Sequence, residues 1–192
     1  MGVIPAWNSR GVLPPIDVQN PASPDRSPYL VTLLDFVLRF GQSPERRKIL
    51  KGYFDFRASL HAAGLTDGFQ WIDGGFIEDI ETTAKRPPND VDVVTFYKLP
   101  VGVSQSQFLA LNPNLDFGDS TKLKAKYRVD GYPVNLDMKA ELLVDFSTYW
   151  YSLFSHRRDT MWRGILRVDL SPAEDAAAIA ALAGLNAQGA QP

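Results

Sequence analysis

Asp90 and Asp92 are the first residues whose types and spacing suggest chemistry. They open an apolar run over 90–97 that is typical of a buried β-strand. Side chains at positions i and i+2 of a strand point to the same face, so the two carboxylates are expected roughly 7 Å apart. Like charges at that distance repel by about 2 kcal/mol at an effective dielectric constant near 20. A divalent cation such as Mg²⁺, which prefers carboxylate and phosphate oxygens, relieves this repulsion. Alternatively, the strand ends in solvent and the pair needs no ligand.

A pair of glycines, Gly74 and Gly75, follows an expected strand over 69–73 and precedes a helix-like segment over 76–82. Glycines at such a place let a phosphate approach the backbone, and a helix N-terminus offers free N–H groups. A tight turn without a ligand is the alternative. The 15 residues from Gly75 to Asp90 are enough to return the chain beside the first strand. The neighbouring Asp73 is expected to be structural.

The two motifs together resemble the signature of the nucleotidyltransferase superfamily. That signature is a Gly-Gly or Gly-Ser turn, then ten or more residues, then an acid-x-acid strand. A resemblance that covers nearly the whole chain is to an uncharacterised bacterial family of short nucleotidyltransferase-like proteins. It rests on four segments, Leu13-Pro14-Pro15, Gln70–Phe76, Asp90–Phe96 and Tyr149–Arg158. The resemblance implies an α+β nucleotidyltransferase (polymerase-beta-like) fold, with a mixed β-sheet flanked by helices.

The resemblance also implies a third carboxylate on a neighbouring strand. Asp130 is favoured, because it stands at the start of an apolar strand expected over 127–136. Asp137 is the alternative third ligand. It lies seven residues further on, so the two side chains would point to opposite faces of a regular strand.

The resemblance assigns roles to these residues. Asp90 and Asp92 would hold two Mg²⁺ ions, and Asp130 would bind the metal that activates the acceptor hydroxyl. Gly74 and Gly75 would hold the triphosphate of an NTP such as ATP. The reaction would transfer a nucleoside monophosphate to an acceptor and release pyrophosphate. Most superfamily members have serine where this chain has Gly75, which removes a hydroxyl that would bond to phosphate.

The implied function is therefore an NTP-dependent transferase with a protein, an RNA such as the 3′ end of tRNA, or a small molecule as acceptor. By analogy with other short bacterial members, a toxin–antitoxin or phage-defence setting is expected. The alternative is a catalytically degenerate protein that binds nucleotide, or an antitoxin-like partner of another protein.

Several basic and aromatic residues have both a functional and a structural interpretation. Lys85, in the loop between the two motifs, could reach the triphosphate. Arg157 and Arg158 could contact it too, although for them a basic helix end favoured by the helix dipole is the alternative. A basic run before the third strand could bind triphosphate or an RNA backbone, or simply face solvent: Lys122, Lys124, Lys126 and Arg128. Four aromatic residues could stack a base or belong to the core: Tyr149, Trp150, Tyr151 and Phe154.

Length and composition limit the class of protein. The chain has 192 residues, of which 45% are hydrophobic, and a net charge of −2. These values fit one globular domain and argue against a dedicated nucleic-acid coat protein. The absence of cysteine excludes disulfides and thiolate zinc sites. No stretch approaches the roughly 18 apolar residues of a transmembrane helix, and no signal peptide is recognised, so we expect no membrane association and a cytoplasmic location.

The expected organisation is a Pro-rich arm over 1–28 packed on the domain, a single domain over 29–185 and a flexible tail over 186–192. Ser-Pro pairs predict the N-termini of helices at Ser27, Ser43 and Ser171. Strands are expected over 69–73, 90–97, 127–136 and 164–170, and helices over 29–40, 44–63, 76–82, 104–111, 120–126, 142–157 and 171–183.

Overall fold

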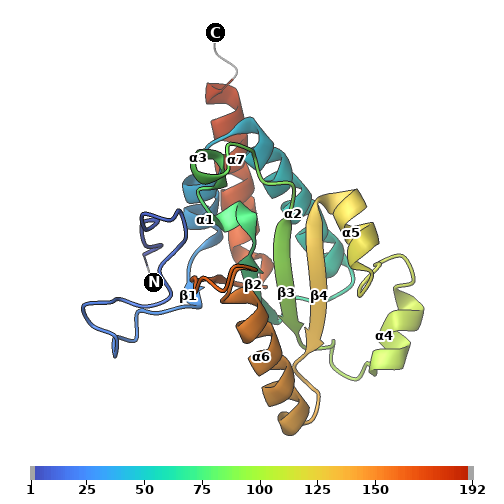
Figure 1. Cartoon of the computed structure of the whole chain (residues 1–192). Coiled ribbons are helices and arrows are strands. Elements are labelled where there is room, and N and C mark those ends of the chain that lie inside the picture. The colour runs from blue at the N-terminus through green and yellow to red at the C-terminus, as the bar shows by residue number, and fades with distance from the viewer. Residues whose placement is uncertain (1–2, 190–192) are drawn as a thin grey trace.

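A mixed five-stranded sheet forms the centre of the molecule, which is known from a computed structural model that describes residues 3–189 (Figure 1). The strand order is β1-β5-β2-β3-β4. The strands are β1 (Tyr29–Leu30), β2 (Gly68–Asp73), β3 (Val91–Tyr97), β4 (Val129–Asn135) and β5 (Leu166–Asp169). The predicted α+β class with a mixed sheet flanked by helices is confirmed.

The three strands that carry the predicted site are adjacent. β3 runs antiparallel to β2 and parallel to β4, while β5 runs antiparallel to β2 and parallel to β1. Within this register Asp73 faces Asp92 across β2 and β3, and Asp92 faces Asp130 across β3 and β4. Residues opposite one another in adjacent strands point to the same face of the sheet. The register therefore places three carboxylates in one row.

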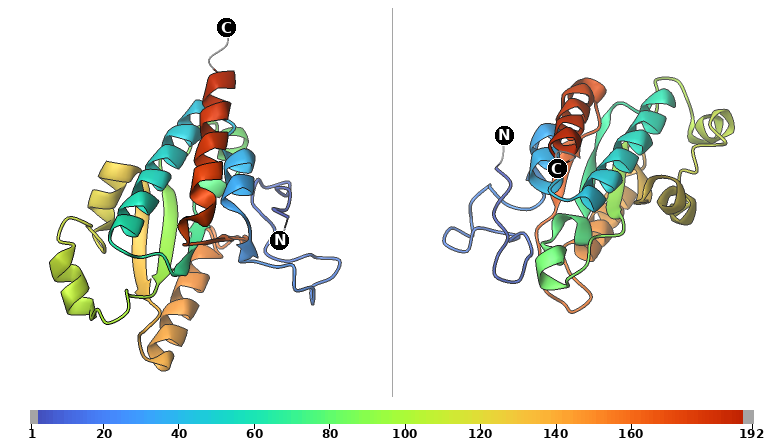
Figure 2. Two further views of the ribbon diagram at one scale, coloured as in Figure 1. Left: turned by 180° about the vertical axis from the view of Figure 1, so that it is seen from behind. Right: turned by 90° about the horizontal axis from the view of Figure 1, so that it is seen from above.

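Helices cover both faces of the sheet (Figure 2). α1 (Leu33–Phe40), α2 (Pro44–Ala62) and α7 (Asp175–Gln188) pack on one face, in one apolar cluster with Val91 and Val93 of β3. On the other face Val94 and Phe96 of β3 pack with Trp150 and Phe154, which belong to α6 (Ala140–Phe154). The period of two along β3 separates these two clusters, and Asp92 lies on the α6 side.

The long helix α2 fixes the glycine turn and the central strands through two fully buried arginines. Arg46 donates to Glu81 Oε2 at 2.7 Å and to the Glu78 carbonyl at 2.6 Å. Arg57 donates to Gln70 Oε1 at 2.9 Å and to Asp175 Oδ1 at 2.7 Å. Buried charges persist when such bonds satisfy them. The connection after β2 is thereby held to α2.

The remaining elements are short. The 3-10 helix η1 (Gly75–Ile77) and α3 (Ile80–Thr83) follow β2, and the 3-10 helix η2 (Pro172–Glu174) precedes α7. α4 (Gln105–Leu111) and α5 (Ser120–Tyr127) lie between β3 and β4. Among residues 3–189, no helix is long and apolar enough to cross a membrane.

The prediction of a helix over 29–40 was wrong at its start. Tyr29 and Leu30 form β1, which pairs with β5, and α1 begins at Leu33 with Thr32 as its N-cap. Ser27 caps no helix, because its hydroxyl accepts a hydrogen bond from the Ile165 N–H at 2.9 Å. A strand partner distant in the sequence thus overrides the local Ser-Pro signal.

Several other boundaries also differ from the prediction. Tyr127 ends α5, so β4 begins at Val129 and not at 127, and β5 is confined to Leu166–Asp169. The segment over 76–82 is not one helix, because Glu78 is extended between η1 and α3. α6 ends at Phe154, so 155–157 lie in the loop that follows. α7 continues to Gln188, beyond the expected end at 183. The tail expected over 186–192 is therefore helical as far as 188, and 190–192 lie outside the described residues.

Candidate active site

A row of carboxylates crosses the sheet on the face that α6 covers. Asp73 is the last residue of β2, Asp92 the second of β3 and Asp130 the second of β4. Asp90 directly precedes β3, on the same parity as Asp92. Because β2 runs opposite to β3 and β4, its end meets their beginnings, and residues from three strands converge at one edge.

Three of these carboxylates are close enough to share a cation. Asp90, Asp92 and Asp130 each offer one oxygen, and these oxygens all lie within 4.8 Å of one another. Oxygens on opposite sides of one Mg²⁺ are about 4.2 Å apart, since each bond is about 2.1 Å. Asp130 Oδ1 is buried and has no hydrogen-bond partner. The donor set therefore fits a hard divalent ion after small side-chain rotations.

The electrostatic environment of Asp92 reflects this crowding. Burial raises the pKa of Asp92 to about 6, and the neighbouring charges of Asp90 and Asp130 act in the same direction. Arg163 and Lys124 oppose the rise. A bound cation would lower that pKa by favouring the ionised carboxylate.

The turn after β2 requires glycine at its first position. Gly74 has φ +87°, a conformation that L side chains rarely adopt, and a Cβ there would lie 2.2 Å from Asp92 Oδ2. Gly75 is less constrained, since a Cβ would meet the flexible end of Ile80 at 2.9 Å. Gly74 thus brings the backbone of the turn directly against a carboxylate of the cluster.

Asp73 is not part of the three-carboxylate cluster. It is 1% exposed, and its Oδ2 pairs with Arg163, which also pairs with Glu78 Oε1. Burial raises the pKa of Asp73 well above its ordinary value, and Arg163 opposes that rise. Asp73 therefore holds the end of β2 to the segment before β5, as its expected structural role implied.

A cavity of about 640 Å³ lies beside the glycine turn. Its lining includes the two glycines, one member of the cluster and three arginines besides Arg163: Gly74, Gly75, Asp92, Arg86, Arg157 and Arg158. Ligand sites for small molecules commonly have volumes of roughly 300–1,000 Å³. The lining also includes the acids Asp73, Glu78 and Asp159, so its charge is mixed. Asp92 belongs both to the carboxylate cluster and to this cavity.

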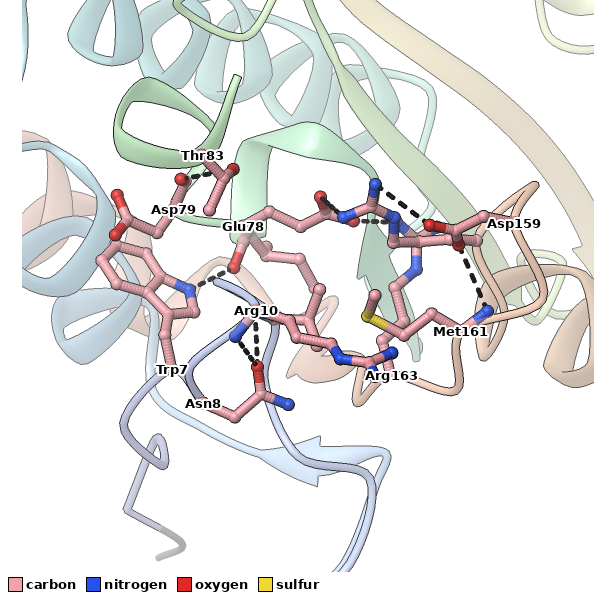
Figure 3. Close-up of polar contacts among 12 residues, drawn as sticks. Trp7, Asn8, Arg10, Glu78, Asp79, Thr83, Asp159, Met161 and Arg163 are labelled. Carbon is pink, nitrogen blue, oxygen red and sulfur yellow. Dashed lines mark hydrogen bonds and ion pairs between the residues drawn. The ribbon is translucent and has the colours of Figure 1, made fainter. Parts of the chain in front are cut away.

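The N-terminal arm packs against the segment that follows the glycine turn. Trp7 Nε1 donates to the Ile77 carbonyl at 2.8 Å, and the Gly11 carbonyl accepts from Asp79 N–H at 2.8 Å. Further along, the Leu13 carbonyl accepts from the Gly164 N–H at 2.7 Å. Figure 3 shows Trp7 beside the turn that carries Glu78 and Asp79. The arm thus contacts both the segment that carries Glu78 and the loop that carries Arg163.

Comparison with known proteins assigns a family. The model of a family of unknown function, DUF6932, matches residues 5–169. The chain belongs to the DUF6932 family. No curated protein and no solved structure matches it. The DUF6932 match includes the arm, the carboxylate cluster and Arg163, and it ends at the last residue of β5.

The structure distinguishes the two candidates for the third acid of this DUF6932 chain. Asp130 lies in the cluster with Asp90 and Asp92. Asp137 follows the opposite end of β4, where its Oδ2 accepts from the Leu99 N–H at 3.0 Å. Because β4 is seven residues long, Asp137 lies outside the carboxylate cluster.

Only some of the residues predicted to contact phosphate lie at the cavity. Arg157 and Arg158 line the cavity, but Lys85 does not, and its neighbour Arg86 does. Lys85 is an exposed residue with a left-handed φ of +54°. Of the aromatic residues, Trp150 and Phe154 are core, whereas Tyr149 is 59% exposed.

Two basic residues have roles that sequence reasoning missed. Arg163 is 11% exposed and pairs with two acids. A lone arginine just before the apolar strand expected over 164–170 was the available signal. Lys124, interpreted as part of a basic run, pairs with Asp90 and lies 3.8 Å from Asp130 Oδ2. No pattern along the chain indicates that contact, because it depends on how the helix packs on the sheet.

Proposed function

We propose that this chain is a Mg²⁺-dependent nucleotidyltransferase that transfers a nucleoside monophosphate from an NTP to a protein, RNA or small-molecule acceptor. The observation that carries the proposal is the position of Asp92. It belongs to the carboxylate cluster and also lines the arginine-rich cavity at the glycine turn. A metal held by the cluster would therefore touch phosphates bound in the cavity.

Each group has a chemical task in this proposal. Asp90, Asp92 and Asp130 would hold Mg²⁺, which supplies charge stabilisation to the attacking and leaving oxygens of phosphoryl transfer. The turn at Gly74 would let the triphosphate approach the backbone. The guanidinium groups at the cavity wall would neutralise phosphate charge, because arginine matches the geometry of phosphate oxygens. Positioning and electrostatics supply most of the rate in such reactions.

A second function, nucleotide binding without turnover, is favoured by one observation. Lys124 pairs with Asp90 and so occupies a carboxylate that the transfer reaction would use for metal. A protein that kept this ion pair would bind NTP in the cavity and lack the full metal set. It would serve as a nucleotide sensor or as an antitoxin-like partner of another protein.

The decisive experiment incubates the protein with Mg²⁺, each α-³²P-labelled NTP and a cell extract, and measures pyrophosphate release and label transfer. Transfer should disappear in Asp90→Ala and Asp92→Ala, whereas Asp137→Ala should retain it, since Asp137 lies outside the cluster. NTP with Mg²⁺ should also raise stability by about 2.7 kcal/mol at 100 times Kd. Binding without release selects the second function, and absence of both results rejects both functions.

A further inference from the structure

Lys124 provides the positive charge closest to the carboxylate cluster. Its Nζ forms a short ion pair with Asp90 Oδ2 and lies 3.8 Å from Asp130 Oδ2. Among residues 3–189, these are the ion pairs that Asp90 and Asp130 make. One ammonium group therefore bridges two of the three carboxylates.

The backbone that carries Lys124 is firmly held. The side chain of Asp119 caps the start of α5 by accepting from the Lys122 N–H. Arg128, with a left-handed φ of +57°, caps its end and leads directly into β4. α5 buries Leu123 and Tyr127 against the domain. Figure 1 shows α5 alongside β4. The same short connection thus positions both Lys124 and Asp130.

The lysine side chain itself is free to leave. It is 50% exposed, and its flexible four-carbon stem allows the ammonium to turn into water when another charge replaces it. Three carboxylates this close repel one another and need a counter-charge. Without metal, Lys124 supplies it. A divalent ion between the same oxygens supplies twice that charge and repels the ammonium.

We propose that Lys124 is an internal counter-ion of the cluster, which stabilises the metal-free chain and is displaced from Asp90 when a divalent metal binds. The displacement rests on the proposed function in assuming that the cluster binds metal. The stabilising role of Lys124 in the metal-free chain does not depend on that assumption. The consequence is a weaker apparent affinity for metal, since binding must displace the lysine, and an ordered site in the metal-free chain.

The test compares Lys124→Met with Lys126→Met, which removes an exposed charge from the same helix. In EDTA, Lys124→Met should unfold at a lower temperature than the control. In titration calorimetry with Mn²⁺ alone, Lys124→Met should bind about three- to tenfold more tightly, the range expected for losing a competing charged contact. Lys124→Arg should keep the wild-type stability in EDTA.

Amine acetylation followed by mass spectrometry reads the displacement directly in the wild-type chain. Adding Mg²⁺ should increase the labelling of Lys124 severalfold and leave that of Lys122 and Lys126 unchanged. Equal or weaker Mn²⁺ binding by Lys124→Met, with normal binding by the wild type, overturns the displacement alone. Absence of Mn²⁺ binding in every variant overturns the displacement and the proposed metal site together. Equal unfolding temperatures in EDTA overturn the counter-ion role.

Discussion

At the scale of single residues, Gly74 is the position where the backbone and the cluster constrain each other. Its φ of +87° excludes most side chains, and its Cα faces Asp92 so closely that a Cβ would lie 2.2 Å from Oδ2. Glycine at this position thus permits both the backbone conformation of the turn and the close approach of the Asp92 carboxylate. Gly102 offers a comparison, because it has φ +79° and nothing within 4 Å of an added Cβ.

Gly74→Ala should therefore lower the free energy of unfolding more than Gly102→Ala does. Gly102→Ala carries only the backbone strain, about 1–2 kcal/mol. Gly74→Ala carries that strain and also displaces Asp92, so it should destabilise by about 2–4 kcal/mol and weaken Mn²⁺ binding. Urea unfolding and calorimetry measure both effects. Equal losses in the two variants would show that the contact with Asp92 has no energetic weight.

At the scale of elements, Arg163 joins segments that the sheet alone does not hold together. It stands between the loop after α6 and β5, and it pairs with Asp73 at the end of β2 and with Glu78 between η1 and α3. All three side chains are largely buried. The glycine turn is therefore fixed from both ends by one guanidinium group.

Arg163→Met should destabilise the protein by about 3–5 kcal/mol near neutral pH, because it leaves the buried carboxylate of Asp73 without its charged partner. Glu78 keeps its ion pair with Arg157. The loss should be smaller at about pH 5. Burial raises the pKa of Asp73 above 3.8, and removing Arg163 takes away the main opposing charge. The folded variant then binds a proton that the unfolded chain releases, so its stability rises as pH falls through the folded pKa. A loss independent of pH, measured by urea unfolding, would contradict this account.

At the scale of the whole molecule, the N-terminal arm contributes to a site formed by residues far along the chain. Trp7 hydrogen-bonds to Ile77, and its indole lies 3.9 Å from the Arg39 guanidinium. The Leu13 carbonyl accepts from Gly164. The arm therefore links α1, the glycine turn and the start of β5, and it acts as part of the domain.

Trp7→Ala should lower stability by about 2–3 kcal/mol, from lost apolar burial and a lost hydrogen bond. Trp7→Phe should recover most of the stability that comes from apolar burial. Val3→Ala, at a side chain that is 87% exposed, should change stability by less than about 0.5 kcal/mol. Thermal and urea unfolding measure these values. If Trp7→Ala behaves like Val3→Ala, the arm lies on the surface without holding the turn.

The sequence by itself determined the local features of this protein. Ser43 and Pro44 predicted the start of α2, and the apolar run after Asp90 predicted β3, because caps and periodicity act within a few residues. The tertiary structure alone decided the rest. Pairing with β5 turned Tyr29 into a strand residue, and the register of β3 with β4 placed Asp130 in the cluster. It also brought Lys124 to Asp90 and Arg163 to Asp73. Such contacts join residues distant in sequence, and charge interactions depend on distance in space, which no local pattern records.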